Sequence, residues 1–365
     1  MKKLLIVDDS ALMRRHITQI FKAESDFIIK SARNGREAID MNREFQPDVI
    51  TLDINMPEMD GLSALSLIMA ERPVPVVMLS SLTAAGALAT FEALNLGAVD
   101  FVTKPDGSIS LSIENIKKDL VEKINSAIKS QPRTRSNSLP QEKAAMPKTR
   151  TQRVKKTEDI TPNVSTQTSR PVSDKDKIVI IGVSTGGPKT LEEILPKLPS
   201  TLAAPIVVAQ HMPASFTASL AERLNRSCGL TVSELSKMTP LKSGNVYIAR
   251  GNADIHLVSR NGQLCAHIKP EDKSHLWHPS VELLGRSALS TCRPNSVMAI
   301  MLTGMGSDGS DAFSELHRRG ATTIAESSET AIVFGMPAEL IDKRGAGTIL
   351  PAHAIAHQIS KWAGA

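Results

Sequence analysis

The stretch Lys177–Pro188, with the sequence KIVIIGVSTGGP, decides the fold of the second half of the chain. Its apolar run predicts a buried strand, the glycines predict a tight turn, and Pro188 suits the first turn of a helix, where a missing N–H is tolerated. Ser184 lies at the crest of this turn, in the G-x-S-x-G pattern that exposes a serine hydroxyl. Glycine-rich turns also bind phosphate groups or only pack closely, so the pattern alone leaves those alternatives open.

Two further strand-like runs in this half lead to residues that could act with the serine. Residues 204–210 (APIVVAQ) precede His211, and residues 296–302 (SVMAIML) lead to Asp308. A histidine can take the proton of a serine and a carboxylate can orient that histidine, so Ser184, His211 and Asp308 form a candidate catalytic triad. The alternatives are a structural histidine and an Asp308 that only caps the helix after it. The order Ser, His, Asp differs from that of α/β-hydrolases.

The first 125 residues show five strand-like runs that alternate with amphipathic helical stretches. The runs are Lys3–Val7, Phe27–Ser31, Val49–Leu52, Val74–Leu79 and Val99–Val102. This alternation predicts a parallel sheet with helices on both faces, and a ligand site at the carboxyl ends of its strands.

Polar side chains follow four of these runs and are expected to meet at one rim: Asp8, Asp9, Asp53, Ser80 and Lys104. Three close carboxylates repel one another and favour Mg²⁺, which accepts a partly hydrated oxygen site. The metal and the lysine would offset the charge of a phosphoryl group on an aspartate, and the serine would add a hydroxyl donor. Any one of these residues could be an ordinary cap or turn residue, but the five together favour a phosphorylatable aspartate.

Residues 131–176 divide the two halves. They are rich in Ser, Thr, Pro, Gln and Lys and have no sustained apolar period, which predicts a flexible tether. The segment holds ten Lys or Arg and five Asp or Glu, a local net charge equal to the +5 of the whole chain. It contains no Phe, Trp or Tyr, so the basic character is interpreted as a solvated linker, and no nucleic-acid partner is expected.

Composition also bears on the compartment. No apolar run approaches the ~18 residues of a membrane helix, so no membrane insertion is expected. The three cysteines Cys228, Cys265 and Cys292 are odd in number and lack paired spacing, which indicates neither a disulfide framework nor a zinc site. The pair His275 and His278 has no evident third ligand and is assigned to a surface loop. These features together predict a cytoplasmic protein.

The motifs of the first half resemble the receiver domain of response regulators: LLIVDDS, DVITLDINMPEMDG, VVMLSS and VDFVTKP. The resemblance implies that Asp53 accepts a phosphoryl group and that Asp8 and Asp9 help to hold Mg²⁺. It further implies that Ser80 is the switch hydroxyl, that Lys104 binds the phosphoryl group, and that Phe101 is the aromatic residue that reorients on activation.

The whole chain apart from the tether resembles the CheB family, chemotaxis response regulators with protein-glutamate methylesterase activity. The matching segments are IGVSTGGP, VVAQHMP, HPSVELL, LTGMGSDG and VFGMPAE. By this resemblance Ser184 is the nucleophile, His211 the general base and Asp308 its orienting carboxylate, with Thr185 and Met305 as helpers around the serine and the oxyanion. The family commonly has Arg before Pro-Ser-Val, where this chain has His278, so positioning of the substrate by that arginine is in doubt.

The predicted organisation is a (βα)5 receiver domain over residues 1–125, a flexible basic linker over 126–176, and a doubly wound, mainly parallel α/β catalytic domain over 177–365. The resemblance implies hydrolysis of glutamyl methyl esters on methylated chemoreceptors, deamidation of glutamines by the same acyl-enzyme, a sensor histidine kinase as partner, and no cofactor in the catalytic domain. Two alternatives stay open: a receiver-controlled binding module without enzyme activity, and an esterase that serves another signalling array.

Overall fold

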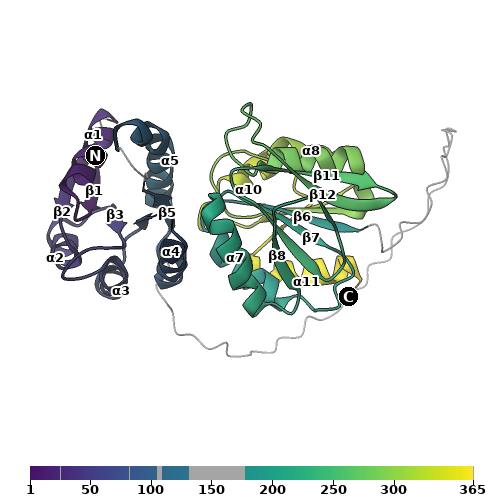
Figure 1. Cartoon of the computed structure of the whole chain (residues 1–365), viewed down its shortest axis with the longest axis horizontal. Helices are drawn as coiled ribbons and strands as arrows, with labels where there is room; N and C mark the ends of the chain where they lie inside the picture. The colour runs from purple at the N-terminus through teal and green to yellow at the C-terminus, as the bar shows by residue number, and fades with distance from the viewer. Residues whose placement is uncertain (25, 82, 105–108, 131–176, 365) are drawn as a thin grey trace, which may run out of the picture.

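The structure is a computed structural model that describes residues 1–24, 26–81, 83–104, 109–130 and 177–364. These residues form two α/β units (Figure 1). The predicted linker, residues 131–176, lies outside the described residues.

The first unit is a parallel sheet flanked by helices, as the alternating pattern predicts. Its strands have the order β2-β1-β3-β4-β5, and every neighbouring pair is parallel. The strands are β1 (Lys2–Val7), β2 (Phe27–Ala32), β3 (Val49–Asp53), β4 (Val76–Ser80) and β5 (Asp100–Thr103). The helices are α1 (Ala11–Ala23), α2 (Gly35–Phe45), α3 (Gly61–Glu71), α4 (Ala84–Leu96) and α5 (Ile109–Lys129). Helix α5 therefore continues beyond residue 125, the end of this unit as predicted from the sequence.

The strand order places the acidic residues together. Strands β3 and β4 are buried at every position, which is why their sequences are continuous apolar runs rather than alternating ones. The connection after β1 leads to β2 on one side, and the connection after β3 leads to β4 on the other side. Ligands bind in the crevice at such a switch point. Asp8 follows β1 and Asp53 ends β3, so both lie at this crevice.

The second unit contains a larger parallel sheet of order β15-β14-β13-β6-β7-β10-β8. Its strands are β6 (Ile178–Val183), β7 (Ile206–Gln210), β8 (Thr231–Leu235), β10 (Asn245–Ala249), β13 (Val297–Met301), β14 (Thr322–Glu326) and β15 (Thr348–Leu350). Its helices are α6 (Gly187–Ile194), α7 (Ala214–Ser227), α8 (Val281–Thr291), α9 (Ser310–Arg318), α10 (Met336–Asp342) and α11 (Ala352–Ala363). A small antiparallel sheet contains the shorter strands β9 (Thr239–Pro240), β11 (Asp254–Arg260) and β12 (Gln263–Lys269).

The centre of the large sheet positions the candidate triad. Strand β6 lies between β13 and β7, with Gly182 opposite Met301 and Val183 opposite Gln210. The three strands therefore end at one level, and the loops that follow them carry Ser184, His211 and Asp308 to the same edge of the sheet.

The two units pack against each other through apolar surfaces. Helix α4 packs on α6 and α7, and Figure 1 shows α4, α5 and β5 on the side of the first unit that faces α7. The ring of Phe101 stacks on that of Phe216, with centroids 4.5 Å apart, and Phe91 meets the same ring edge-on at 6.4 Å. Both phenylalanines of the first unit are buried, so the contact extends the hydrophobic core across the boundary.

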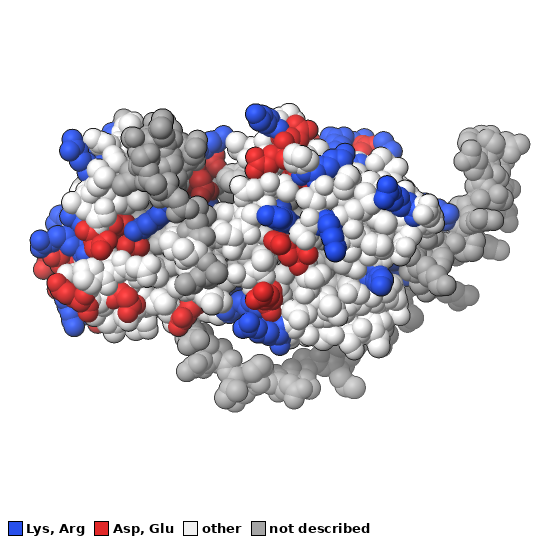
Figure 2. Space-filling view, in the orientation of Figure 1, with Lys and Arg blue, Asp and Glu red and all other residues white. Residues whose placement is uncertain are grey.

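Among the described residues, none of the helices has the combination of length and apolar character that crossing a bilayer would require. The face seen in Figure 2 carries acidic and basic side chains interspersed over both units.

Candidate active site

The turn after β6 carries the candidate nucleophile, but Ser184 is buried, 9% exposed, and not open to solvent as the G-x-S-x-G pattern predicts. Its backbone is fixed by two hydrogen bonds: the Ser184 N–H donates to the carbonyl of Thr303 at 3.0 Å, and the Gly187 N–H donates to the carbonyl of Ser184 at 2.8 Å. Gly186 has φ +80°, a left-handed conformation that disfavours any side chain, and a Cβ there would lie 2.7 Å from that of Ile332. Because the Ser184 N–H is already bonded to Thr303, it does not serve as an oxyanion donor in this conformation.

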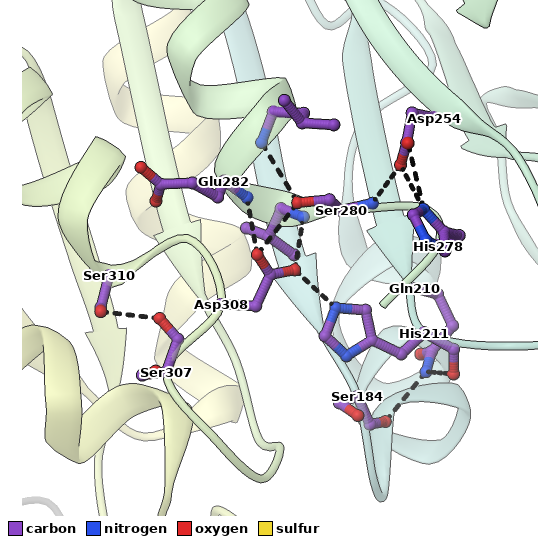
Figure 3. Close-up of polar contacts among 12 residues, drawn as sticks. Ser184, Gln210, His211, Asp254, His278, Ser280, Glu282, Ser307, Asp308 and Ser310 are labelled. Atoms are coloured by element: carbon purple, nitrogen blue, oxygen red, sulfur yellow. Dashed lines mark hydrogen bonds and ion pairs between the residues drawn. The ribbon is translucent and has the colours of Figure 1, made fainter. Parts of the chain in front are cut away.

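His211 and Asp308 form a direct hydrogen bond at 2.9 Å between Nε2 and Oδ2. Both side chains are largely buried, 3% exposed for His211 and 10% for Asp308. Within the described residues Nδ1 of His211 has no hydrogen-bond partner, and Figure 3 shows it on the ring edge that faces Ser184. An aspartate that accepts from Nε2–H leaves the lone pair on Nδ1, so the nitrogen available to a serine proton here is Nδ1.

Asp308 is held by the start of α8, as Figure 3 shows. Its carboxylate accepts hydrogen bonds from the hydroxyl of Ser280 at 3.0 Å and from the backbone N–H groups of Val281 at 2.7 Å and Glu282 at 3.0 Å. Burial favours the neutral acid, but the hydrogen bond and charge of His211 and these N–H donors hold the pKa of Asp308 below its usual value. The carboxylate is therefore kept ionised beside the imidazole.

The alternative that Asp308 only caps the following helix is wrong. Helix α9 starts after Gly309 and has no side-chain cap, whereas Asp308 binds the N-terminus of α8, a helix that precedes it in the sequence. The N-terminal dipole of α8 stabilises a negative charge at this position.

The residues expected to assist the serine contact the first unit. The hydroxyl of Thr185 donates to Oδ2 of Asp100 at 2.5 Å, and Met305 Sδ is in contact with the hydroxyl of Ser126 on α5. Asp100 also lies near Lys123, whose ammonium donates to the Phe101 carbonyl at 2.7 Å. The first unit therefore contacts Thr185 and Met305, the two residues expected to assist Ser184.

The acidic rim of the first unit assembles as the sequence predicts. Ligand atoms of Asp8, Asp9 and Asp53 all lie within 4.8 Å of one another, and the Lys104 ammonium lies 2.9 Å from Asp8 Oδ2 and 2.7 Å from Asp53 Oδ2. Burial, aided by the nearby charge of Asp8, raises the pKa of Asp53 to about 6 although Lys104 opposes this shift. Three oxygen donors with excess negative charge match what Mg²⁺ binds, so the residues present fit that ion.

Ser80 does not face this rim in the structure. Its hydroxyl accepts from Thr90 Oγ1 at 2.7 Å and lies 3.2 Å from the carbonyl of Gly86, both on α4. Phe101 is 4% exposed and lies against Phe216. The expected switch residues are thus engaged with α4 and with the second unit.

The assignment of the histidine pair to a surface loop was partly wrong. His275 and His278 do lie in the loop between β12 and α8, but the side chain of His278 is 13% exposed and its Nδ1 lies 3.0 Å from both oxygens of the buried Asp254. The cavity beside the triad is lined by other residues of that loop, Ser274 to Trp277, and not by His278.

Four residues of the site were not found by sequence reasoning: Asp100, Gln210, Asp254 and Ser280. Gln210 donates through Nε2 to the carbonyl of Ser184 at 2.9 Å and so supports its turn. Only Ser280 has a local signal, a Pro-Ser pair before an apolar helical run that marks an N-cap. The other three act through contacts between segments far apart in the chain.

The chain is similar to known proteins over both of its units. The family model described as CheB methylesterase matches residues 179–359, and the one described as response regulator receiver domain matches residues 4–113. A protein-glutamate methylesterase/protein-glutamine glutaminase of Rhodospirillum rubrum is 47% identical over 362 residues, 99% of this chain and 96% of the relative. The chain belongs to the CheB family.

Further CheB relatives are similar along their whole length. The protein-glutamate methylesterase/protein-glutamine glutaminase 2 of Carboxydothermus hydrogenoformans is 45% identical, covering 98% of each chain. The crystal structure of the Thermotoga maritima CheB methylesterase catalytic domain matches with a TM-score of 0.50 and 41% identity, covering 52% of this chain and 99% of that one. The predicted fold class, a receiver domain joined to a mainly parallel α/β catalytic domain, is thereby confirmed.

Proposed function

We propose that the chain hydrolyses methyl esters of glutamyl side chains on chemoreceptors, and deamidates glutamines, with Ser184 as nucleophile. The observation that carries the proposal is the hydrogen bond from His211 Nε2 to Asp308, which leaves Nδ1 directed toward Ser184. Residues 177–365 are proposed as the catalytic domain, 1–125 as the receiver domain and 126–176 as the linker.

The first step forms the acyl-enzyme. Ser184 Oγ attacks the ester carbonyl carbon while its proton passes to Nδ1 of His211, and the ionised Asp308 stabilises the imidazolium. The imidazolium then gives the proton to the departing oxygen, so methanol leaves. Backbone N–H groups near Thr185 and Met305 are proposed to bind the oxyanion, a contribution that typically amounts to ~10²–10³ in turnover per donor.

The second step returns the enzyme. Water attacks the acyl carbon, its proton passes to Nδ1 of His211, and Ser184 leaves with that proton as the glutamate is released. Deamidation follows the same course with ammonia as the leaving group. No cofactor is needed for this chemistry at the residues described.

We further propose that a sensor histidine kinase of a chemosensory system phosphorylates Asp53. Asp8, Asp9 and Asp53 would hold Mg²⁺, which when bound offsets the negative charge of the phosphoryl group. Lys104 contacts Asp8 and Asp53 here and would exchange these contacts for a phosphoryl oxygen. A cytoplasmic location is proposed with these partners.

Strand β5 provides a physical connection between the two sites. Lys104 follows its carboxyl end, while Asp100 and Phe101 at its start bind Thr185 and Phe216 of the catalytic domain. A movement of Lys104 toward a phosphoryl group therefore acts on the strand that holds Thr185. We propose that phosphorylation loosens these contacts and uncovers Ser184, and that Ser80 and Phe101 rearrange with them.

The test is methanol release from methylated chemoreceptor membranes, with and without a small phosphodonor. We expect release that rises with the phosphodonor in the wild type and is absent in Ser184→Ala. Release without dependence on the donor would contradict the proposed control. A Ser184→Ala protein that retains full receptor binding and a wild type that releases no methanol would favour the non-enzymatic binding module.

A further inference from the structure

Trp277 lies flat against the ring of His211. The two ring centroids are 5.3 Å apart and the planes differ by 10°, a stacked arrangement. Trp277 belongs to the loop between β12 and α8 and is partly exposed. It also lines a cavity of about 360 Å³ with residues that include Met305 and Asp308. One face of the imidazole is therefore covered by an indole at the wall of the cavity beside the candidate triad.

A single buried carboxylate fixes the loop that carries Trp277. Asp254 is 0% exposed and accepts hydrogen bonds from the backbone N–H of Asp272 at 2.7 Å and of Ser280 at 3.0 Å. Its oxygens also lie 3.0 Å from Nδ1 of His278, the residue after the tryptophan. Both ends of the segment 272–280 are thus tied to one point, which restricts where the indole can lie.

The stack contacts a face of the His211 ring, which the hydrogen bonds in the plane of the ring do not reach. Nε2 is bonded to Asp308 and Nδ1 is left for the serine proton, so both edges of the ring are assigned. The faces of the ring remain, and the negative face of an indole attracts a cation placed over it. In the proposed reaction the imidazole gains a positive charge when it takes the serine proton, so this attraction acts on the transition state.

We propose that Trp277 is a positioning residue for His211: it holds the imidazole plane in line with Asp308 and Ser184, and stabilises the imidazolium during acyl transfer. Asp254, through His278 and the two backbone N–H groups, holds Trp277 in place. This inference rests on the proposed function, because it assigns to His211 the role of general base.

The kinetic test separates this role from substrate binding. Trp277→Ala is expected to lower kcat for methyl ester hydrolysis about tenfold, with KM changed by less than about twofold. Trp277→Phe keeps an aromatic face and is expected to recover most of the loss. Trp362→Phe, on the distant helix α11, is the matched control and is expected to keep wild-type kinetics.

A spectroscopic test reports the stack independently of turnover. The chain has two tryptophans, so Trp362→Phe leaves Trp277 as the sole indole emitter. The ring of His211 lies directly against the indole, so the emission of Trp277 is expected to change in His211→Gln, which removes the stacked imidazole. The emission is expected to stay unchanged in His275→Gln, although His275 belongs to the same loop.

The outcomes are distinct. The inference would be overturned if Trp277→Ala kept the wild-type kcat, or if Trp277→Phe did not restore a reduced kcat. The proposed function would still stand if Ser184→Ala were inactive. Emission that is unchanged in His211→Gln would also overturn the inference, since the stack would then be absent. Hydrolysis that survives in Ser184→Ala would instead refute the proposed function.

Discussion

Two buried aspartates, Asp53 in the receiver domain and Asp308 in the catalytic domain, have opposite electrostatic surroundings. Burial favours the neutral form of each, yet the pKa of Asp53 is raised to about 6 and that of Asp308 is lowered. Asp308 accepts four hydrogen bonds, from His211, Ser280, Val281 and Glu282. Asp53 has the repelling charge of Asp8 nearby, and its donors are Lys104 and a long 3.4 Å bond from the Asn55 N–H.

Both carboxylates are buried, but Asp308 accepts more hydrogen bonds than Asp53, and donors to the charged form lower the pKa of a carboxyl group. A carboxylate that must stay charged through a reaction suits a site where both of its oxygens accept hydrogen bonds. A group that must accept a phosphoryl group and a metal suits a site with unsatisfied charge. The roles that we propose for Asp308 and Asp53 follow that division.

The largest effect is expected from removing the charge of Asp308, the carboxylate that accepts four hydrogen bonds. Asp308→Asn should lower kcat for methyl ester hydrolysis by about 10³–10⁴, because the amide cannot stabilise the imidazolium and favours the wrong tautomer. Steady-state kinetics on methylated receptor membranes measures it, with Asp311→Asn on α9 as the control. A loss of less than about tenfold would mean that Asp308 only supports α8.

The same substitution at Asp53, the carboxylate with fewer donors, should raise the stability of the protein at neutral pH. The pKa of Asp53 is about 6 in the folded protein against an ordinary 3.8, so its contribution to stability is present below about 3.8 and is lost as pH rises through about 6. The loss amounts to about 3 kcal/mol by the time the group is fully ionised. Asp53→Asn should remove this pH dependence.

Hydrogen exchange of the β1 and β3 amides, recorded with a chelator present, measures the opening free energy that this prediction concerns. Wild-type protection should fall between pH about 4 and about 7 after correction for intrinsic exchange, and Asp53→Asn protection should stay level. Equal profiles would show that Lys104 already compensates the charge.

A smaller effect is expected at the boundary between the domains. Asp100→Ala removes the acceptor that binds the Thr185 hydroxyl, so basal hydrolysis without phosphodonor should rise about threefold to tenfold as the receiver loosens. The exposed Glu92 on α4 provides the control as Glu92→Gln. Basal activity that falls in Asp100→Ala would mean that Asp100 helps to order the active site instead of restraining it.

The sequence predicted the parts of both sites that lie at strand ends. Apolar runs located β1, β3, β6, β7 and β13, and the parallel arrangement then brought Asp53 to Asp8 and Ser184 to His211. It did not predict the donors that distinguish the two aspartates. Asp308 is bound by the start of α8, nearly thirty residues earlier in the chain, and this pairing depends on the packing of α8 on α9.

Contacts across the domain boundary were also beyond the sequence pattern. Asp100 has the sequence context of an ordinary residue at the start of a strand, and its bond to Thr185 forms between two units that are far apart in the sequence. The sequence pattern correctly places Ser80 at the end of β4. Its hydroxyl accepts a hydrogen bond from Thr90 on α4, and the sequence pattern does not predict this contact.

The most direct test of the central claim is covalent labelling of the full chain with a fluorophosphonate, which reacts only with an activated serine hydroxyl. Mass spectrometry of the digested protein should find a single adduct on the peptide that contains Ser184, and the labelling rate should rise with a small phosphodonor. Asp308→Asn should label far more slowly. An adduct at another serine, or equal rates with and without the phosphodonor, would contradict the account.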